Sequence, residues 1–137
     1  MVSSSNKLKL NNTGQALVEF ALILPFLLFL TFAIIEFGRY LYIKNAATNG
    51  ARQGARVAAV TPLDWTPTRK SAIYHAATSI KAGSGAWNTP VIAPDPPSTS
   101  GVAITVTVSK PFTMMPFLTY FVPTLTSVSA SATMRYE

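Results

Sequence analysis

Few residues of this sequence could carry out chemistry. The chain has no cysteine and a single histidine, His75. Its carboxylates are scattered along the chain: Glu19, Glu36, Asp64, Asp95 and Glu137. A metal site needs several histidine, cysteine or carboxylate ligands close together. We therefore predict no metal and no cofactor, and we interpret His75 as a surface residue or one that is hydrogen-bonded locally.

Other kinds of catalysis also lack their signatures. A serine, a histidine and an aspartate could be combined only from unrelated segments, and serine is too common to be evidence for a triad. The run Gly83-Ser84-Gly85 lacks the lysine and the helix entry of a phosphate-binding loop. The sequence predicts a protein that is not an enzyme and has no small-molecule substrate.

Glu19 is unusual because of the residues around it. It is the only charged residue in the segment 16–35, which is strongly apolar and contains one proline, Pro25. A helix of this length spans about 30 Å, the hydrocarbon thickness of a bilayer. Proline is tolerated in a membrane helix as a kink. We predict that residues 16–35 form a membrane-inserted helix.

The carboxylate of Glu19 needs a partner or water. A charged side chain at the centre of a membrane helix costs about 2.5–3.5 kcal/mol even on lenient insertion scales. Either Glu19 binds a partner, or it reaches interfacial water because it lies only a few residues from the start of the helix. Glu36, at the other end, is interpreted as interfacial, and Arg39 lies at the spacing for an ion pair with it.

The apolar segment favours a retained anchor over a cleaved secretory signal. The apolar core of such a signal is usually about 7–15 residues long, and a small-residue cleavage site follows it. Here the core is longer, and the residues after it do not resemble that site: Glu36, Phe37, Gly38 and Arg39. Basic residues flank both ends of the segment, so the charge distribution leaves the orientation open: Lys7 and Lys9 against Arg39, Lys44 and Arg52.

The charge composition gives two further indications. Charged residues make up 12% of the chain, about half the share usual in soluble domains, which favours a membrane or a tight assembly. The net charge is +6, but the basic residues are spread thinly from Lys7 to Arg135. Because a phosphate-binding face needs clustered positive charge, we predict no nucleic-acid partner.

The helical pattern continues beyond the apolar segment, through the alanine-rich residues 40–60. Small residues recur there every four positions in two adjacent rows: Gly50, Gly54 and Ala58, beside Ala47, Ala51, Ala55 and Ala59. Such rows let another backbone approach closely, and a packing partner would offset the cost of glycine in a helix, about 1 kcal/mol relative to alanine. The small residues pack either on the chain's own distal domain or on neighbouring subunits.

The distal part, residues 61–137, is predicted to be a small α+β domain. A second, amphipathic helix is expected over 67–82 and a turn-rich loop with short extended pieces over 83–101. Alternating patterns predict strands over 102–108 and 128–136, paired antiparallel with one face on a helix. The predicted fold is therefore a long transmembrane and extended helix, a short second helix and a small antiparallel sheet packed against the helix.

The apolar connection between the two strands, residues 111–124, is interrupted by prolines at 111, 116 and 123. It is too short to span a bilayer. It is expected either to fold onto the local core or to form a contact patch for a membrane surface or another subunit.

The start of the apolar helix resembles a known family. The run Gly14-Gln15-Ala16-Leu17-Val18-Glu19-Phe20 resembles the prepilins of type IV pilus systems and, more narrowly, TadE-like pseudopilins of the tight adherence (Flp) pilus apparatus. Later pieces, in the same order along the chain, extend the resemblance over most of it: Ala51, Arg52, Ala55 and Arg56, then Lys110-Pro111-Phe112, then Ala132-Thr133-Met134-Arg135.

The resemblance implies processing and a location. A prepilin peptidase would cut after Gly14, so that Gln15 becomes the mature N-terminus and Glu19 its fifth residue. The chain would then consist of a leader (1–14), a transmembrane and extended helix (15–60) and a small extracytoplasmic domain (61–137). The protein would cross the bacterial inner membrane once, with its C-terminal domain outside the cytoplasm, and could enter an extracellular pilus. Glu19 would meet the N-terminal amine of a neighbouring subunit.

Two hypotheses of function follow. In the first, the chain is a structural pilin-like subunit that contributes to the assembly of an adhesive pilus. Its partners would be the prepilin peptidase, other pilin-like subunits and the pilus assembly machinery. In the second, it is a membrane-tethered binding module that stays out of any fibre and recruits a partner through residues 111–124. Only the first hypothesis requires Glu19.

Overall fold

The computed structural model describes residues 12–61, 66–83, 85–95, 99–120, 122–123 and 125–136, with side chains from residue 14 onward. The chain divides into two compact units, Met1–Ile35 and Glu36–Glu137. The expected leader lies outside the described residues except for its last positions, and so do Asp64 and Glu137.

Helix α1, Asn12–Val60, is a single helix that contains Pro25. Its continuity through residues 40–60 confirms the helical pattern read from the alanine-rich sequence. The helix ends where Thr61 precedes a proline, as expected from the clash between proline and a helical preceding residue. The Thr61 hydroxyl donates to the Val57 carbonyl oxygen at 2.6 Å, and the buried Tyr136 hydroxyl donates to the Thr61 carbonyl oxygen at 2.6 Å. These bonds satisfy groups that a helix end leaves open.

Three strands form an antiparallel sheet in the order β1-β2-β3. They are β1 (Val91–Ala93), β2 (Ala103–Pro111) and β3 (Ser127–Arg135). The two predicted strands are confirmed, although β2 continues to Pro111, which pairs with Ser127. The third strand, β1, lies in the region expected to be a loop with short extended pieces, and it pairs with residues 105–107 of β2.

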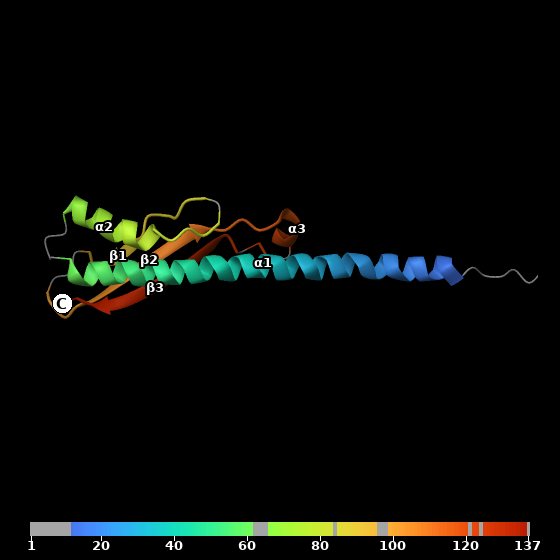
Figure 1. Cartoon of the computed structure of the whole chain (residues 1–137), viewed down its shortest axis with the longest axis horizontal. Coiled ribbons are helices and arrows are strands. Elements are labelled where there is room, and N and C mark those ends of the chain that lie inside the picture. Colours follow the sequence, from blue (N-terminus) through green and yellow to red (C-terminus); the bar gives the residue numbers. More distant parts are fainter. Residues whose placement is uncertain are drawn as a thin grey trace, which may run out of the picture. The chain divides into compact units, whose positions relative to one another are not determined.

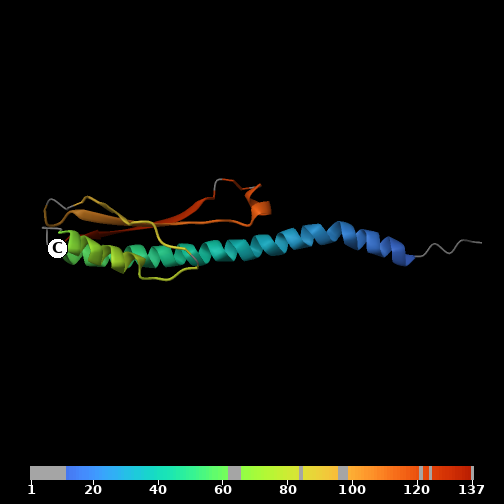
Figure 2. The ribbon, with the colours of Figure 1, turned by 90° about the horizontal axis from the view of Figure 1, so that it is seen from above.

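Within the unit Glu36–Glu137 the sheet forms one layer, and α1 together with helix α2 (Pro67–Thr78) forms the other (Figures 1 and 2). Alternate residues of β2 point into the space between the layers, and Ile104, Val106 and Val108 are fully buried there. They pack with Ala51, Ala55 and Ala58 of α1, with Ile73 and Ala77 of α2, and with Tyr136. This is the predicted α+β fold, with the sheet packed against the helix.

The second helix is shorter than predicted, since α2 ends at Thr78 and not at residue 82. The carbonyl oxygens beyond its end accept hydrogen bonds from side chains instead of from helical N–H groups. Trp87 Nε1 donates to Ile80 at 2.8 Å, Tyr42 Oη to Lys81 at 3.3 Å and Lys110 Nζ to Ala82 at 2.5 Å. These donors from outside α2 stabilise a non-helical course for residues 80–82.

Lys110 is a charged residue in the core, with 2% of its surface exposed. Its ammonium group donates to the carbonyl oxygens of Ala82 and Gly85, the latter at 2.7 Å, and lies 5.3 Å from the centre of the Trp87 ring. A buried charge is tolerated when hydrogen bonds replace its water. Lys110 therefore holds Ala82, Gly85 and Trp87 against β2.

Replacing Lys110 by methionine is expected to lower the free energy of unfolding by about 2 kcal/mol, because two carbonyl oxygens lose a charged donor. The measurement is thermal unfolding of the full chain in detergent, followed by near-ultraviolet circular dichroism. The matched control is Lys70→Met, since Lys70 pairs with Asp95 at 2.9 Å where both side chains are 31% exposed. Exposed pairs contribute about 0–1 kcal/mol. Equal effects of the two substitutions would contradict this role of Lys110.

The connection between β2 and β3 is partly buried in the local core and partly exposed. It includes the short helix α3, Pro116–Thr119. Phe112 and Leu118 are buried, whereas Phe117, Tyr120 and Val122 are exposed. Phe112 belongs to a second core cluster with Ile43, Ala46, Ala82 and Val128. One part of the connection thus closes the local core, and the other part presents apolar surface.

Candidate functional site

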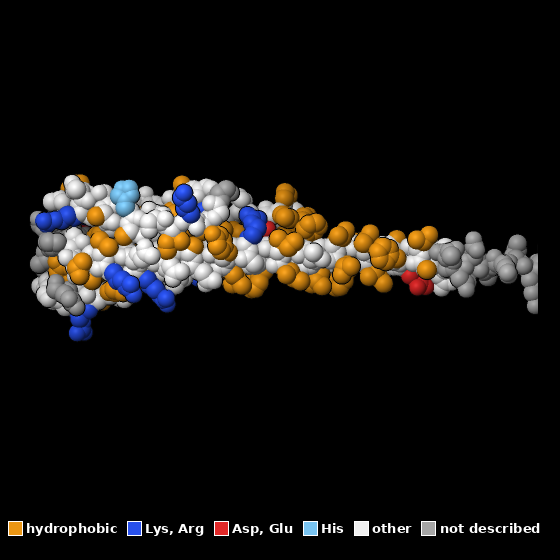
Figure 3. Space-filling model, viewed as in Figure 1, with side chains coloured by type: hydrophobic (Ala, Val, Ile, Leu, Met, Phe, Trp, Pro, Cys, Tyr) orange, Lys and Arg blue, Asp and Glu red, His pale blue; other side chains and the backbone are white. Residues whose placement is uncertain are grey.

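The N-terminal part of α1 presents an apolar surface in every direction. All described side chains of residues 14–35 are exposed apart from Ala33, which is partly buried. Figure 3 shows hydrophobic side chains along this segment. Within the part of the chain that the structure describes, one helix is long and apolar enough to cross a membrane. Its most apolar stretch has a mean hydropathy of 2.5, and none of that stretch is buried. An uncovered apolar helix of this length fits a single-pass membrane protein.

The polar groups of this segment are satisfied locally. Gln15 Nε2 donates to Glu19 Oε1 at 3.1 Å, one helical turn apart. The Thr31 hydroxyl donates to the Leu27 carbonyl oxygen at 2.8 Å. Glu19 still carries the only charge between Gly14 and Ile35, and a neutral amide offsets that charge only in part. The structure contains one chain, so the partner expected for Glu19 is outside it.

Among the described residues, and leaving aside the backbone of its own helix, a Cβ atom added at Gly14 would meet no atom within 4 Å. Gly14 and Gln15 both lie within α1 and are exposed.

The second unit begins with an ion pair on α1. Arg39 Nη1 lies 2.9 and 2.7 Å from the two carboxylate oxygens of Glu36, which confirms the pairing expected from their spacing. Glu36 is buried within its own unit, with 2% of its surface exposed, and its interfacial position stays a prediction. The Arg39 guanidinium lies 5.4 Å from the centre of the Phe112 ring, and Tyr40 contacts the same ring edge-on at 5.9 Å.

The small residues of α1 pack inside their own unit. Ala47, Ala51, Ala55 and Ala58 are fully buried. A Cβ atom built on Gly50 would lie 2.2 Å from the Ala77 carbonyl oxygen of α2, and one on Gly54 would lie 2.8 Å from the Ala77 Cβ. The glycines thus allow α2 and α1 to approach at backbone distance. The face of α1 that carries these residues is occupied by the same chain.

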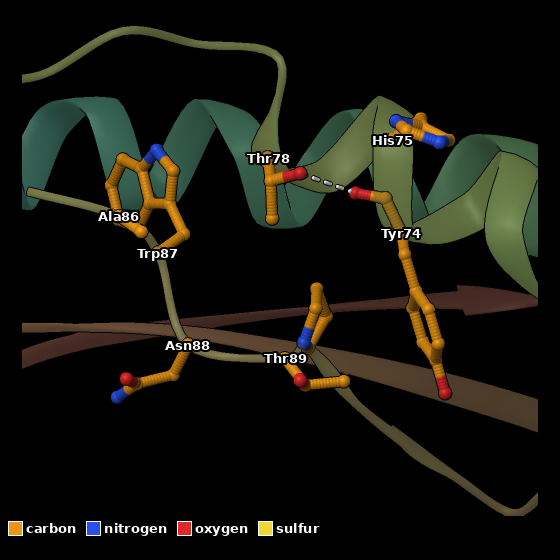
Figure 4. A pocket seen from close by; sticks show the side chains of 8 residues that line it. Tyr74, His75, Thr78, Ala86, Trp87, Asn88 and Thr89 are labelled. Carbon is orange, nitrogen blue, oxygen red and sulfur yellow. Dashed lines mark hydrogen bonds between the residues drawn. The ribbon is translucent and has the colours of Figure 1, made fainter.

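A groove with a volume of about 440 Å³ lies between α2 and residues 86–90 (Figure 4). It was not predicted from the sequence. Tyr74 and Thr78 line it from α2, and Trp87, Asn88 and Thr89 line it from the opposite segment. A tryptophan inside a polar, turn-rich segment is the one sequence signal that could have pointed to it.

None of the described residues that line the groove is lysine, arginine, aspartate or glutamate. The described residues also contain no group of three or more histidine, cysteine or carboxylate side chains that could hold a metal ion.

Comparison with protein families gives one match. Residues 14–56 match the family described as TadE-like protein. The match confirms the resemblance for residues 14–56, which include the N-terminal motif and Ala51, Arg52, Ala55 and Arg56. The later pieces of the resemblance, at residues 110–112 and 132–135, lie outside the match. No curated protein and no solved structure matches the chain.

Proposed function

We propose that the chain is a TadE-like minor pilin or pseudopilin that contributes to the assembly of an extracellular adhesive pilus. The observation that carries the proposal is the family match, which begins at Gly14 and covers the start of an apolar helix that nothing else in the structure buries. The exposed segment needs a hydrocarbon environment. A bilayer supplies that environment before assembly, and a bundle of neighbouring apolar helices would supply it within a fibre.

The proposed role fixes a location and an order of events. The protein is inserted once in the bacterial inner membrane, with the unit Glu36–Glu137 outside the cytoplasm. The prepilin peptidase removes residues 1–14. The new amino group at Gln15 and the carboxylate at Glu19 then become available to neighbouring subunits. The role is structural and involves no catalytic step, cofactor or nucleic acid.

Glu19 is the residue we assign to subunit assembly. Its carboxylate is the only charged side chain on the exposed segment 14–35, where the other polar side chains are those of Gln15 and Thr31 and the rest are apolar. Opposite charges attract more strongly where water is excluded. A neighbouring N-terminal amine would therefore bind Glu19 most strongly within a helix bundle, and this pairing would set the axial position of one subunit against the next.

Incorporation into a fibre is the property that tests the proposal. Mechanical shearing releases an assembled subunit from cells together with the pili, whereas a tethered module stays with the membrane fraction. We expect the mature chain in both fractions. Its presence in membranes alone, in cells that make pili, would contradict the proposal and favour the membrane-tethered module, for which the exposed Phe117, Tyr120 and Val122 offer a contact surface.

A further inference from the structure

The groove between α2 and residues 86–90 has the chemistry of a binding site for an uncharged ligand. Its volume of about 440 Å³ lies within the range of small-ligand sites, about 300–1,000 Å³. The side chains in view in Figure 4 combine two aromatic rings, Tyr74 and Trp87, with the hydroxyl and amide groups of Thr78, Thr89 and Asn88. His75 also lines the groove, from an exposed position on α2.

The polar groups of the groove keep hydrogen-bonding capacity for a ligand. The Thr78 hydroxyl donates its proton to the Tyr74 carbonyl oxygen at 2.8 Å, so its oxygen can still accept. Asn88 donates through Nδ2 to the Ser109 hydroxyl at 3.0 Å, which leaves its Oδ1 as an acceptor. A ligand that carries several hydroxyl groups matches these acceptors.

The Trp87 ring is fixed, and its only donor is already used. Nε1 donates to the Ile80 carbonyl oxygen at 2.8 Å, and the Lys110 ammonium lies 5.3 Å from the ring centre. A ring held in this way loses little entropy when a ligand binds. A tryptophan that binds a proline-rich peptide donates its indole N–H to a carbonyl oxygen of that peptide. The indole N–H of Trp87 is already bonded to Ile80, so Trp87 cannot make this contact. It can contribute only ring surface.

We propose that this groove binds a neutral saccharide. A pyranose ring has an apolar C–H face that packs on an aromatic ring, and hydroxyl groups around its rim that donate to acceptors such as Thr78 Oγ1 and Asn88 Oδ1. The absence of charged residues among the described lining residues disfavours a polyanionic or cationic ligand. This binding goes beyond the assembly role and does not depend on it.

The test uses the purified full chain in a zwitterionic detergent, because maltoside detergents carry saccharide headgroups. The probes are neutral tetrasaccharides of glucose, N-acetylglucosamine, galactose and mannose, with decaproline as the peptide alternative. Binding is measured by saturation-transfer NMR and calorimetric titration. We expect at least one tetrasaccharide to bind with a Kd below about 1 mM, and decaproline not to bind.

Two variants connect that binding to the groove. Thr89→Arg places a long charged side chain at an exposed position of the groove and is expected to weaken saccharide binding about tenfold or more. Asn88→Ala, which removes an acceptor at another exposed position, is expected to weaken it as well. The control is Thr68→Arg, the same change at an exposed position of α2 that does not line the groove. Near-ultraviolet circular dichroism verifies that each variant is folded.

Three results would overturn the proposal. They are no binding of any tetrasaccharide at millimolar concentration, saccharide binding that Thr89→Arg and Asn88→Ala leave unchanged, and binding of decaproline alone. Each of these results is obtained with purified protein, so none of them bears on processing at Gly14 or on entry into a fibre.

Discussion

Replacing Gly50 by alanine is expected to lower the free energy of unfolding by about 2 kcal/mol and the melting temperature by about 10 °C. The added Cβ would lie 2.2 Å from the Ala77 carbonyl oxygen. That atom belongs to the backbone of α2, so relief requires the two helices to move apart. The gain in helix propensity from glycine to alanine, about 1 kcal/mol, offsets only part of this cost.

Two further glycines of α1 provide matched comparisons. Gly54→Ala is expected to be destabilising to a smaller extent, since its Cβ would meet the side chains of Ala77 at 2.8 Å and Val106 at 3.1 Å. Gly38→Ala is expected to be neutral or stabilising by up to about 1 kcal/mol, because its Cβ would meet no atom within 4 Å. Thermal unfolding of the full chain in detergent gives the order of stability of the three variants. Equal stability of Gly50→Ala and Gly38→Ala would contradict the close packing of α1 on α2.

Replacing Glu19 by glutamine is expected to reduce the amount of the chain in sheared fibres about tenfold or more, while its insertion in the membrane is unchanged. Glutamine retains the size and the hydrogen-bonding groups that Glu19 presents to Gln15, so only the negative charge is lost. A hydrogen bond to a charged group contributes about 1.5–3 kcal/mol, which corresponds to about a tenfold or greater change in an association constant.

The control for the Glu19→Gln variant is Thr31→Val, a substitution in the same apolar segment. The Thr31 hydroxyl is bonded to its own helix, so its loss is expected to leave both insertion and assembly intact. The amounts of each variant in sheared fibres and in membranes are compared by immunoblotting. Normal fibre content of Glu19→Gln would favour the hypothesis that the carboxylate only reaches interfacial water.

Helices α1 and α2 and the two long strands could be predicted because their signals are local, whereas the four-residue helix α3 was not predicted. The apolar and alanine-rich runs of α1 and the alternation of Ile104, Val106 and Val108 in β2 each follow from neighbouring residues. The end of α2 could not be predicted this way, because the donors to residues 80–82 are Tyr42, Trp87 and Lys110. Strand β1 is only three residues long and depends on its pairing with β2.

The candidate site was predictable to a different degree in each part. The motif from Gly14 to Glu19 is a contiguous run, so the sequence alone pointed to it. The rows of small residues on α1 suggested close packing but not the partner, since only the folded chain places Ala77 against Gly50 and Gly54. The groove joins α2 to residues 86–90, which approach one another only through tertiary structure.

The central claim is that the chain enters a pilus-type assembly route, and intact-mass spectrometry of the protein from host membranes tests it most directly. The measurement compares cells with and without the prepilin peptidase. The account predicts a mature chain that begins at Gln15 when the peptidase is present, and an uncleaved N-terminus when it is absent. An intact N-terminus in both strains would contradict the account and leave a membrane-tethered domain.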